Sequence, residues 1–443
     1  MSAFLRIACN CTTKYVLFRV INDFNSKNKL LMLDINFIRE NIDRVKTAGK
    51  AKNRTIDIDY LLLLDDKRKH FQGVIDQLKF DQKKAGQERN IELATSLKSQ
   101  IATQSEQYEE ILSEFNALML QVPQVIHSEV IIGKDESENV EVRKEWKVPE
   151  FDFPFQDHIA LMEKNNMLDI ERGVKLSGAR SYILSWDGAM LEQAVLQYAF
   201  QKMVKKWFTP MNIPYMVDTS CLIGTGYFPG GEEDAYHMER DDKRLIATAE
   251  IPLTAYYKDE ILDISELPKT FVGLSPCFRR EAGSYGRDTR GLYRVHQFNK
   301  VEQVVILPAD EVLSNERYNR ILSNAEEVLH DLDIPYRLLA LCTGDMALWK
   351  YITHDIECWM PSRESYGETH SASSFLDFQA RRLNIRYRDT DGKVKTCYTM
   401  NNTVLASPRF LIALIENYQN ADGSIRIPKV LQEYMGKDLI KNF

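Results

Sequence analysis

The chain has 443 residues, 44% of them hydrophobic and 27% charged, which is enough for two or three globular domains. Its formal net charge of −7 excludes attraction of nucleic acid by the surface as a whole, so a polyanionic partner must meet a local basic patch. No apolar run approaches the roughly 18 residues of a membrane span. The seven scattered cysteines have no spacing that predicts disulfides or a zinc site.

The N-terminal segment is basic and poor in acids. Arg6, Lys14 and Arg19 precede the first acidic residue, Asp23. This composition is typical of an organellar transit peptide, whereas a secretory signal would have an uninterrupted apolar core. An unspecialised extension is the other alternative. We expect residues 1–30 to be a mitochondrial transit peptide and the chain to act in the mitochondrial matrix.

Residues 57–120 predict two long helices in an antiparallel coiled-coil hairpin. Apolar and other seam residues recur at steps of three and four from Leu61 to Ala85 and, after GQERN, from Ala94 to Leu118. A two-helix rod buries only one seam, so we expect it to project as an arm from an N-terminal domain, residues 31–125.

Basic residues gather near the expected tip of this arm. They are Lys79, Lys83, Lys84 and Arg89. Lys79 and Lys83 lie one helical turn apart on one face. The cluster is either a solvated face balanced by nearby acids or a contact for a bulky, phosphate-rich ligand.

The remaining chain predicts a linker and one large α+β domain. We expect residues 126–150 to be a linker, because the stretch from Gly133 to Trp146 is polar and charged. From about residue 151 to residue 443, short β-rich runs bounded by glycine turns alternate with helical segments. This pattern favours an antiparallel sheet flanked by helices.

The stretch around CFRREAGS and GLYRVHQFNKVE predicts a ligand-binding hairpin. With side chains alternating along each strand, Arg279 and Glu281 share one face, and Arg294, Phe298 and Glu302 share another. Arginine suits phosphate, a phenyl ring stacks on a base, and a carboxylate receives an ammonium group. A nucleotide triphosphate site explains this combination better than a solvated strand face does.

These residues resemble motif 2 of the class II aminoacyl-tRNA synthetases, and in particular of the seryl-tRNA synthetases. TGYFPGGEEDAY with LIATAEIPLT, SYGETHSAS, and NNTVLASPRF resemble further segments of that family, the last being its motif 3. The helical hairpin is similar to the family's tRNA-binding arm. The resemblance extends from about residue 33 to the C-terminus.

The resemblance implies a role for each matching residue. ATP would be bound by Arg279, Glu281, Arg294, Phe298, Glu368, Ser371 and Arg409, with the three arginines as catalytic groups and Phe298 and Arg409 on opposite faces of the adenine. Serine would be bound by Thr248, Glu250, Glu302, Asn401 and Thr403. Glu368 and Ser371 would hold Mg²⁺ with the ATP, Lys79, Lys83, Lys84 and Arg89 would contact tRNA, and Pro214 would lie at a homodimer interface.

The activity implied is that of a serine–tRNA ligase. L-serine and ATP would give seryl-adenylate, and the seryl group would pass to the 3′ end of a mitochondrial serine tRNA. Two alternatives remain from the sequence. One is a catalytically silent synthetase-like paralogue acting as a tRNA-binding or partner subunit, and the other is a ligase that charges a carrier protein.

The chain departs from the bacterial pattern of this family in motif 3, at Trp207 and at Ser181, which replaces an expected aromatic residue. Motif 3 has Asn402, Val404 and Pro408 in place of a glycine-rich sequence, and its Thr403 together with Pro408 resembles animal mitochondrial members. Trp207 stands where a glycine is usual. Loss of glycine matters where the backbone must approach a ligand or adopt a positive φ.

Overall fold

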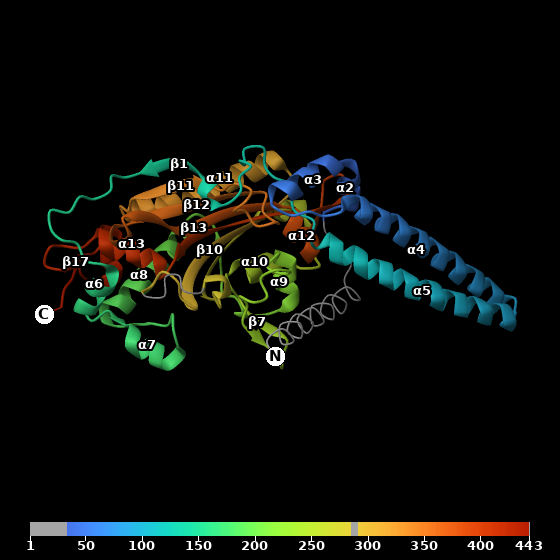
Figure 1. Ribbon diagram of the computed structural model, residues 1–443, viewed down its shortest axis with the longest axis horizontal. Coiled ribbons are helices and arrows are strands. Elements are labelled where there is room, and N and C mark those ends of the chain that lie inside the picture. Colours follow the sequence, from blue (N-terminus) through green and yellow to red (C-terminus); the bar gives the residue numbers. More distant parts are fainter. Residues whose placement is uncertain (1–32, 285–290, 443) are drawn as a thin grey trace, which may run out of the picture. The chain divides into compact units, whose positions relative to one another are not determined.

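The computed structural model describes residues 33–284 and 291–442 (Figure 1). The expected transit peptide, residues 1–30, lies outside them. The chain divides into two compact units between Pro123 and Gln124. None of the described helices is long and apolar enough to cross a membrane.

The first unit is helical in its described part. Its helices are α2 (Ile35–Glu40), α3 (Ile42–Ala51), α4 (Ile58–Gln87) and α5 (Ile91–Met119). α4 and α5 run side by side along their lengths (Figure 1), which confirms the predicted helical hairpin. The predicted seam residues are buried or half-buried, and Leu61, Ile75 and Ala85 are at most 3% exposed.

A buried ion cluster joins the helices at the base of the hairpin. Asp65 is fully buried and pairs with Arg39 (2.9 Å), Arg68 (2.6 Å) and Lys69 (2.7 Å). The Arg68 guanidinium also lies over the ring of Phe115 in α5, 4.6 Å from its centroid. Burial alone would raise the pKa of Asp65, but the three cations together lower it below its ordinary value. The cluster therefore ties α2 to α4 and α4 to α5.

An eight-stranded sheet forms the centre of the second unit. The strand order is β1-β11-β12-β13-β16-β10-β9-β4, and neighbours are antiparallel except for β4 and β9. The strands span Val140–Glu145 (β1), Tyr336–Ala340 (β11), Ile352–Met360 (β12), Ser365–Leu376 (β13), Tyr398–Ala406 (β16), Gln297–Leu307 (β10), Lys269–Phe278 (β9) and Thr209–Met211 (β4). The predicted α+β architecture around an antiparallel sheet is confirmed.

Helices and small sheets surround this sheet. The helices are α6 (His158–Lys164), α7 (Ile170–Ser177), α8 (Trp186–Lys205), α9 (Thr219–Thr225), α10 (Glu250–Ala255), α11 (Glu311–Asp331), α12 (Phe378–Leu383), α13 (Arg409–Asn417) and α14 (Gln432–Met435). The small sheets pair β2 (Leu168–Asp169) with β3 (Ile183–Leu184), β5 (Met216–Asp218) and β6 (His237–Met238) with β7 (Lys243–Leu245), β8 (Ile261–Asp263) and β15 (Val394–Thr396) with β14 (Arg386–Arg388), and β17 (Ile425–Arg426) with β18 (Leu439–Ile440).

The two faces of the sheet carry different helices. α11 packs on one face, where Gln303 of β10 and Asn402 of β16 both donate hydrogen bonds to the backbone oxygen of Ile321 (2.8 Å each). α12 packs on the other face, where the Thr399 hydroxyl of β16 donates to Gln379 Oε1 (2.8 Å). α10 contacts β10 and α12. Odd-numbered residues of β16 such as 399, 401 and 403 therefore point away from α11.

The sequence-based expectation of a linker at residues 126–150 does not hold throughout. Residues 140–145 form β1, which pairs with β11 from Val140 opposite Ala340 to Glu145 opposite Tyr336. The strand alternates valines with charged residues, and all but Glu145 are exposed. Charged residues are common on an edge strand, so the same composition suits a linker and a sheet edge.

Candidate active site

A cavity of about 410 Å³ lies on the face of the sheet opposite α11. β10 lines it with Phe298, Lys300 and Glu302, and β16 lines it with Asn401 and Thr403. These side chains share a face because each set is spaced by two residues along its strand. The period-two prediction for Phe298 and Glu302 is confirmed.

The predicted alternation of side chains between two strand faces does not apply to the residues outside these strands. β9 ends at Phe278 and β10 begins at Gln297, so Arg279, Glu281 and Arg294 lie in the connection and not on strand faces. Glu281 has φ of 55°, which turns the chain out of the extended conformation. All three nevertheless line the cavity, and Arg294 pairs with Glu281 at 3.4 Å.

Arg279 and Phe298 lie together in the cavity. The Arg279 guanidinium lies 5.1 Å from the centroid of the Phe298 ring. Its backbone N–H donates to the carbonyl oxygen of His296 at 2.9 Å, which holds the two segments of the connection side by side. The site therefore presents a fixed positive charge beside an aromatic face.

Arg409 is held by several groups at the start of α13. Its guanidinium lies over the Tyr293 ring, 4.3 Å from the centroid, and it donates to Tyr293 O (3.1 Å), Glu368 O (2.8 Å) and Glu368 Oε2 (3.1 Å). Enclosure in the cavity would raise the pKa of Glu368, but Arg409 and then Arg279 lower it below its ordinary value. The Glu368 carboxylate is therefore charged between two arginines.

Two buried carboxylates mark the other end of the cavity. Glu302 is 2% exposed, and its Oε2 forms an ion pair with Lys300 Nζ (2.6 Å) and accepts a hydrogen bond from Thr403 Oγ1 (3.2 Å). Glu250 is 6% exposed, and its oxygens accept from Gln379 Nε2 (2.7 Å) and the Tyr227 hydroxyl (3.0 Å).

The charges of these two carboxylates influence each other. Burial, and then the negative charge of Glu302, raises the pKa of Glu250 above its ordinary value. Burial also raises the pKa of the Tyr227 hydroxyl well above its ordinary value, so Tyr227 stays a hydrogen-bond donor at neutral pH. This end of the cavity therefore suits a small cationic group.

Thr248 differs from the other predicted serine-binding residues. It is buried, does not line the cavity, and uses its Oγ1 to accept from the Glu250 backbone N–H (3.2 Å). It thereby fixes the start of α10 and the backbone that carries Glu250.

The departures from the bacterial pattern lie mostly away from the cavity. Asn402 and Val404 are fully buried and do not line it, and Asn402 bonds to α11 on the other face of the sheet. Pro408 does line the cavity. Trp207 has φ of 69°, the left-handed region that favours glycine, and its side chain is 89% exposed.

The predicted metal ligands fit a site completed by a substrate. Glu368 and Ser371 both line the cavity, and half-buried Asp355 of β12 pairs with Ser371 across neighbouring strands. Burial and the nearby charge of Glu368 raise the pKa of Asp355 to about 7. Among the described residues no group of three or more His, Cys, Asp or Glu side chains is arranged to hold a metal ion. Phosphate oxygens would have to supply further ligands, as is usual for Mg²⁺.

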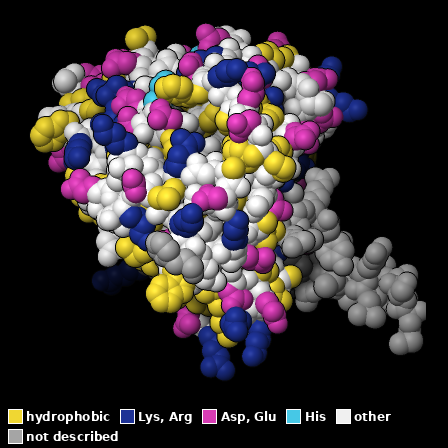
Figure 2. Space-filling view, turned by 90° about the vertical axis from the view of Figure 1, so that its left-hand side faces the viewer, with side chains coloured by type: hydrophobic (Ala, Val, Ile, Leu, Met, Phe, Trp, Pro, Cys, Tyr) yellow, Lys and Arg dark blue, Asp and Glu magenta, His cyan; other side chains and the backbone are white. Residues whose placement is uncertain are grey.

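The remaining predicted residues lie on exposed surfaces. Lys79, Lys83 and Lys84 near the C-terminal end of α4, and Arg89 in the turn after it, are exposed. Pro214 is exposed between β4 and β5. On the face that Figure 2 shows, acidic and basic side chains are interspersed, so no single-signed patch marks it.

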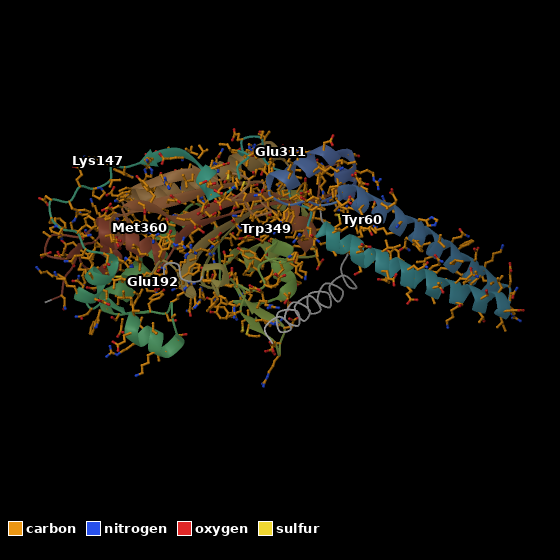
Figure 3. All side chains as sticks on the ribbon, viewed as in Figure 1. Tyr60, Lys147, Glu192, Glu311, Trp349 and Met360 are labelled. Atoms are coloured by element: carbon orange, nitrogen blue, oxygen red, sulfur yellow. The ribbon has the colours of Figure 1, made fainter. Side chains whose placement is uncertain are left out.

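Sequence reasoning assigned no role to several cavity residues. Tyr227, Tyr293, Lys300, Lys350 and Trp349, labelled in Figure 3, all line it. Alternation along β10 places Lys300 on the face of Phe298 and Glu302 but gives it no role. The others come from loops, whose approach to the sheet has no periodic signal in the sequence.

Two family models match the chain. They are the tRNA synthetase class II core domain (G, H, P, S and T), over residues 235–418, and the seryl-tRNA synthetase N-terminal domain, over residues 32–126.

Individual proteins match over nearly the whole chain. The serine–tRNA ligase of Deinococcus radiodurans is 43% identical over 415 residues, which is 91% of this chain and 98% of that protein. A structure of seryl-tRNA synthetase from Pyrococcus horikoshii complexed with ATP has a TM-score of 0.84 and 36% identity, covering 93% of this chain and 100% of its own. A cytoplasmic serine–tRNA ligase from Naegleria fowleri in complex with AMP has a TM-score of 0.83 and 30% identity, covering 93% and 99%.

Proposed function

The chain belongs to the class II seryl-tRNA synthetase family and is a serine–tRNA ligase, and from this premise we propose that its cavity converts L-serine and ATP into seryl-adenylate and that the seryl group then passes to the 3′ end of a mitochondrial serine tRNA. The observation that carries the proposal is the arrangement along one cavity. Arg279 and Phe298 lie at one end, and the buried carboxylates Glu250 and Glu302 lie at the other.

ATP would occupy the end with the arginines. The Phe298 ring offers a flat face to adenine, Arg409 would take the opposite face, and Glu281 would accept from the adenine amino group. Arg279 would hold the α-phosphate and Arg294 the outer phosphates, because a planar guanidinium matches phosphate oxygens.

Mg²⁺ would be held with ATP by Glu368 and Ser371. Their carboxylate and hydroxyl oxygens suit a hard cation, and phosphate oxygens would complete its ligands. When bound, the ion would neutralise phosphate charge and orient the phosphates.

Serine would occupy the end with the carboxylates. Glu302 would receive the ammonium group, Asn401 and Thr403 would contact the remainder of the amino acid, and Glu250, with Thr248 behind it, would complete the wall. The carboxylate of serine would then face the α-phosphorus at Arg279. No side chain in this arrangement is placed as a covalent nucleophile, so the rate would come from orientation and charge neutralisation.

The helical hairpin of the first unit would bind the tRNA. Its tip is basic at Lys79, Lys83, Lys84 and Arg89, whereas the chain as a whole is acidic. Local positive charge of this kind attracts a phosphate backbone.

Two copies of the chain would form a homodimer around Pro214. Apolar side chains near it in the sequence are exposed in the single chain: Val204 (37%), Trp207 (89%), Tyr215 (38%) and Met216 (58%). Exposed apolar groups that gather in one region favour a protein partner. A synthetase-like paralogue as partner is the alternative to a second identical chain.

The mitochondrial assignment rests on the sequence. The N-terminal 22 residues are basic without an acid, and motif 3 carries Thr403 and Pro408. Import into isolated mitochondria with shortening of the chain supports this assignment, whereas exclusion from the organelle contradicts it.

Transfer of radiolabelled serine tests the complete proposal. Purified protein with ATP and Mg²⁺ should charge mitochondrial serine tRNA. Adenylate formation without transfer to any tRNA, but with transfer to a carrier protein, would indicate the carrier-protein ligase instead. Absence of both reactions in folded protein would indicate the silent paralogue.

A further inference from the structure

Lys300 is a buried cation in the middle of the candidate active site. It is 5% exposed and lies on β10 between Phe298 and Glu302, on the strand face that lines the cavity. Lysine is almost never this buried unless its ammonium group is paired. Its position therefore calls for an account of each of its hydrogen bonds.

The ammonium group has one more N–H donor than the described part of the chain uses. Nζ carries three N–H groups. The ammonium forms an ion pair with Glu302 Oε2 at 2.6 Å and donates one hydrogen bond to Thr403 Oγ1 at 3.4 Å. Within the described ranges no third acceptor contacts Nζ. A buried donor without a partner costs free energy, so a group that enters the cavity gains by accepting from it.

Two side chains next to Lys300 also have polar atoms without a partner among the described residues. Both recorded contacts of Glu302 use Oε2, and among the described side chains Oε1 has no donor. Asn401, two residues before Thr403 on β16, has a buried Nδ2 without a partner. One acceptor and two donors are thus left open around a small volume, which fits a compact ligand with an ammonium group and a hydroxyl group.

The direction in which the Lys300 side chain points indicates which group of such a ligand lies nearest to it. The reacting carboxylate must lie toward Arg279, whose guanidinium is over the Phe298 ring. The Lys300 ammonium is drawn the other way, onto Glu302 and Thr403. The ligand group nearest Nζ is therefore on the amine side of the molecule.

We propose that Lys300 donates its third hydrogen bond to the side-chain hydroxyl of the bound amino acid, and so selects serine over alanine. The inference rests on the proposed serine site. In this arrangement Lys300 pairs with Glu302 and donates a further hydrogen bond to the ligand hydroxyl. Alanine leaves that N–H buried without an acceptor, and this is the type of loss that gives strong discrimination.

The test compares amino-acid selectivity of Lys300→Met with that of the unaltered chain. ATP–pyrophosphate exchange is measured with L-serine and with L-alanine, and the ratio of the two kcat/KM values is the readout. A lost hydrogen bond from a charged donor should lower this ratio by about 10- to 100-fold, mainly through serine. Lys300→Gln, which keeps a neutral donor, should fall in between. The KM for ATP and the melting temperature check that both variants are folded, and Lys393→Met on the exposed β14–β15 turn is the matched control.

The outcomes are distinct. An equal loss with serine and alanine in both variants would mean that Lys300 only holds Glu302 or binds the common carboxylate, and would overturn the inference. An unchanged ratio would overturn it as well. Failure of the unaltered chain to exchange with serine would instead refute the proposed function, because that result does not involve Lys300.

Discussion

Phe298 is the residue whose assigned contact is simplest to remove. Replacing Phe298 by Leu should raise the KM for ATP by about 5- to 150-fold, because stacking of a base on an aromatic ring contributes roughly 1–3 kcal/mol. The KM for serine should stay within about twofold. Phe298→Tyr keeps the ring and is the control. A Leu variant with an unchanged KM for ATP would remove Phe298 from the adenine site.

Glu192 of α8 (Figure 3) gives a prediction on pH and stability. It is 8% exposed and its Oε1 accepts from the Ser407 hydroxyl at 2.5 Å, beside the turn that carries Arg409. Burial raises its pKa although hydrogen bonds from Ser407 and Asn299 oppose this. A carboxyl group with a raised pKa holds its proton longer in the folded state, so its contribution to stability falls as pH rises from its ordinary value of 4.5 through the folded pKa.

Glu192→Gln removes this titration and keeps the acceptor for Ser407. The melting temperature of the variant relative to the unaltered chain should therefore be higher at pH 8 than at pH 4.5. Thermal melts of both proteins across this range measure the difference. A constant difference at all pH values would mean that Glu192 ionises as freely in the folded state as in the unfolded state.

Sequence reasoning found the residues whose chemistry and spacing coincide. Phe298 and Glu302 follow from alternation along one strand. The same alternation places Lys300 on this face, but alternation alone gives a charged side chain no role. Asp355 could not be found because its position opposite Ser371 depends on the pairing of β12 with β13.

The ion cluster at the base of the helical hairpin gives a prediction about an element. Asp65→Asn should lower the free energy of unfolding of the first unit by about 1–3 kcal/mol, less than for a fully enclosed pair because Arg39 and Lys69 are partly exposed. Asp66→Asn is the matched control, because Asp66 also pairs with Arg39 but its side chain is 61% exposed. Chemical unfolding of the full chain, followed by helix content, measures both. Equal effects of the two substitutions would contradict the role of the cluster.

The basic tip of α4 gives a prediction about tRNA. Replacing Lys79, Lys83 and Lys84 by Ala should raise the KM for tRNA by about tenfold or more at physiological salt and leave ATP–pyrophosphate exchange unchanged. The exposed lysines Lys393, Lys429 and Lys437, replaced together, serve as the control. Equal loss of exchange and charging would show that the tip acts on the fold and not on tRNA.

Elements with a sustained period were predictable, and their exact ends were not. The seam from Leu61 to Ala85 specifies α4 because steps of three and four persist over many turns. The strands of the hairpin are shorter than the alternation of side chains predicted. Glu281 has a positive φ, and no local sequence pattern predicts it. β1 was missed because an edge strand and a linker share a charged composition.

The whole molecule gives a prediction about assembly. The unaltered chain should sediment as a particle of two 51.4 kDa chains. Trp207→Lys combined with Met216→Lys should shift it toward a single chain, because two exposed apolar side chains near Pro214 are replaced by charges. Val312→Lys is the control, since Val312 is 81% exposed at the start of α11. An unaltered chain that stays single at micromolar concentration would contradict the proposed homodimer.

The fold class of the second unit was predictable from the sequence, but the order of the strands in its sheet was not. Short strands and intervening helices indicate an α+β domain with an antiparallel sheet. The order β13-β16-β10-β9 brings strands from distant parts of the sequence together, and it is this order that places Glu302 beside Thr403. Pairings of that kind depend on tertiary packing and have no local signal.

Serine-dependent exchange of pyrophosphate into ATP tests the central claim most directly, because it reports adenylate formation in the cavity without tRNA. The account predicts exchange with L-serine, little with L-alanine, and a loss of at least about 100-fold in Arg279→Ala, which removes a charge from the reacting phosphate. Folded protein that binds ATP and yet shows no exchange with serine, or that exchanges with a different amino acid in its place, would contradict it.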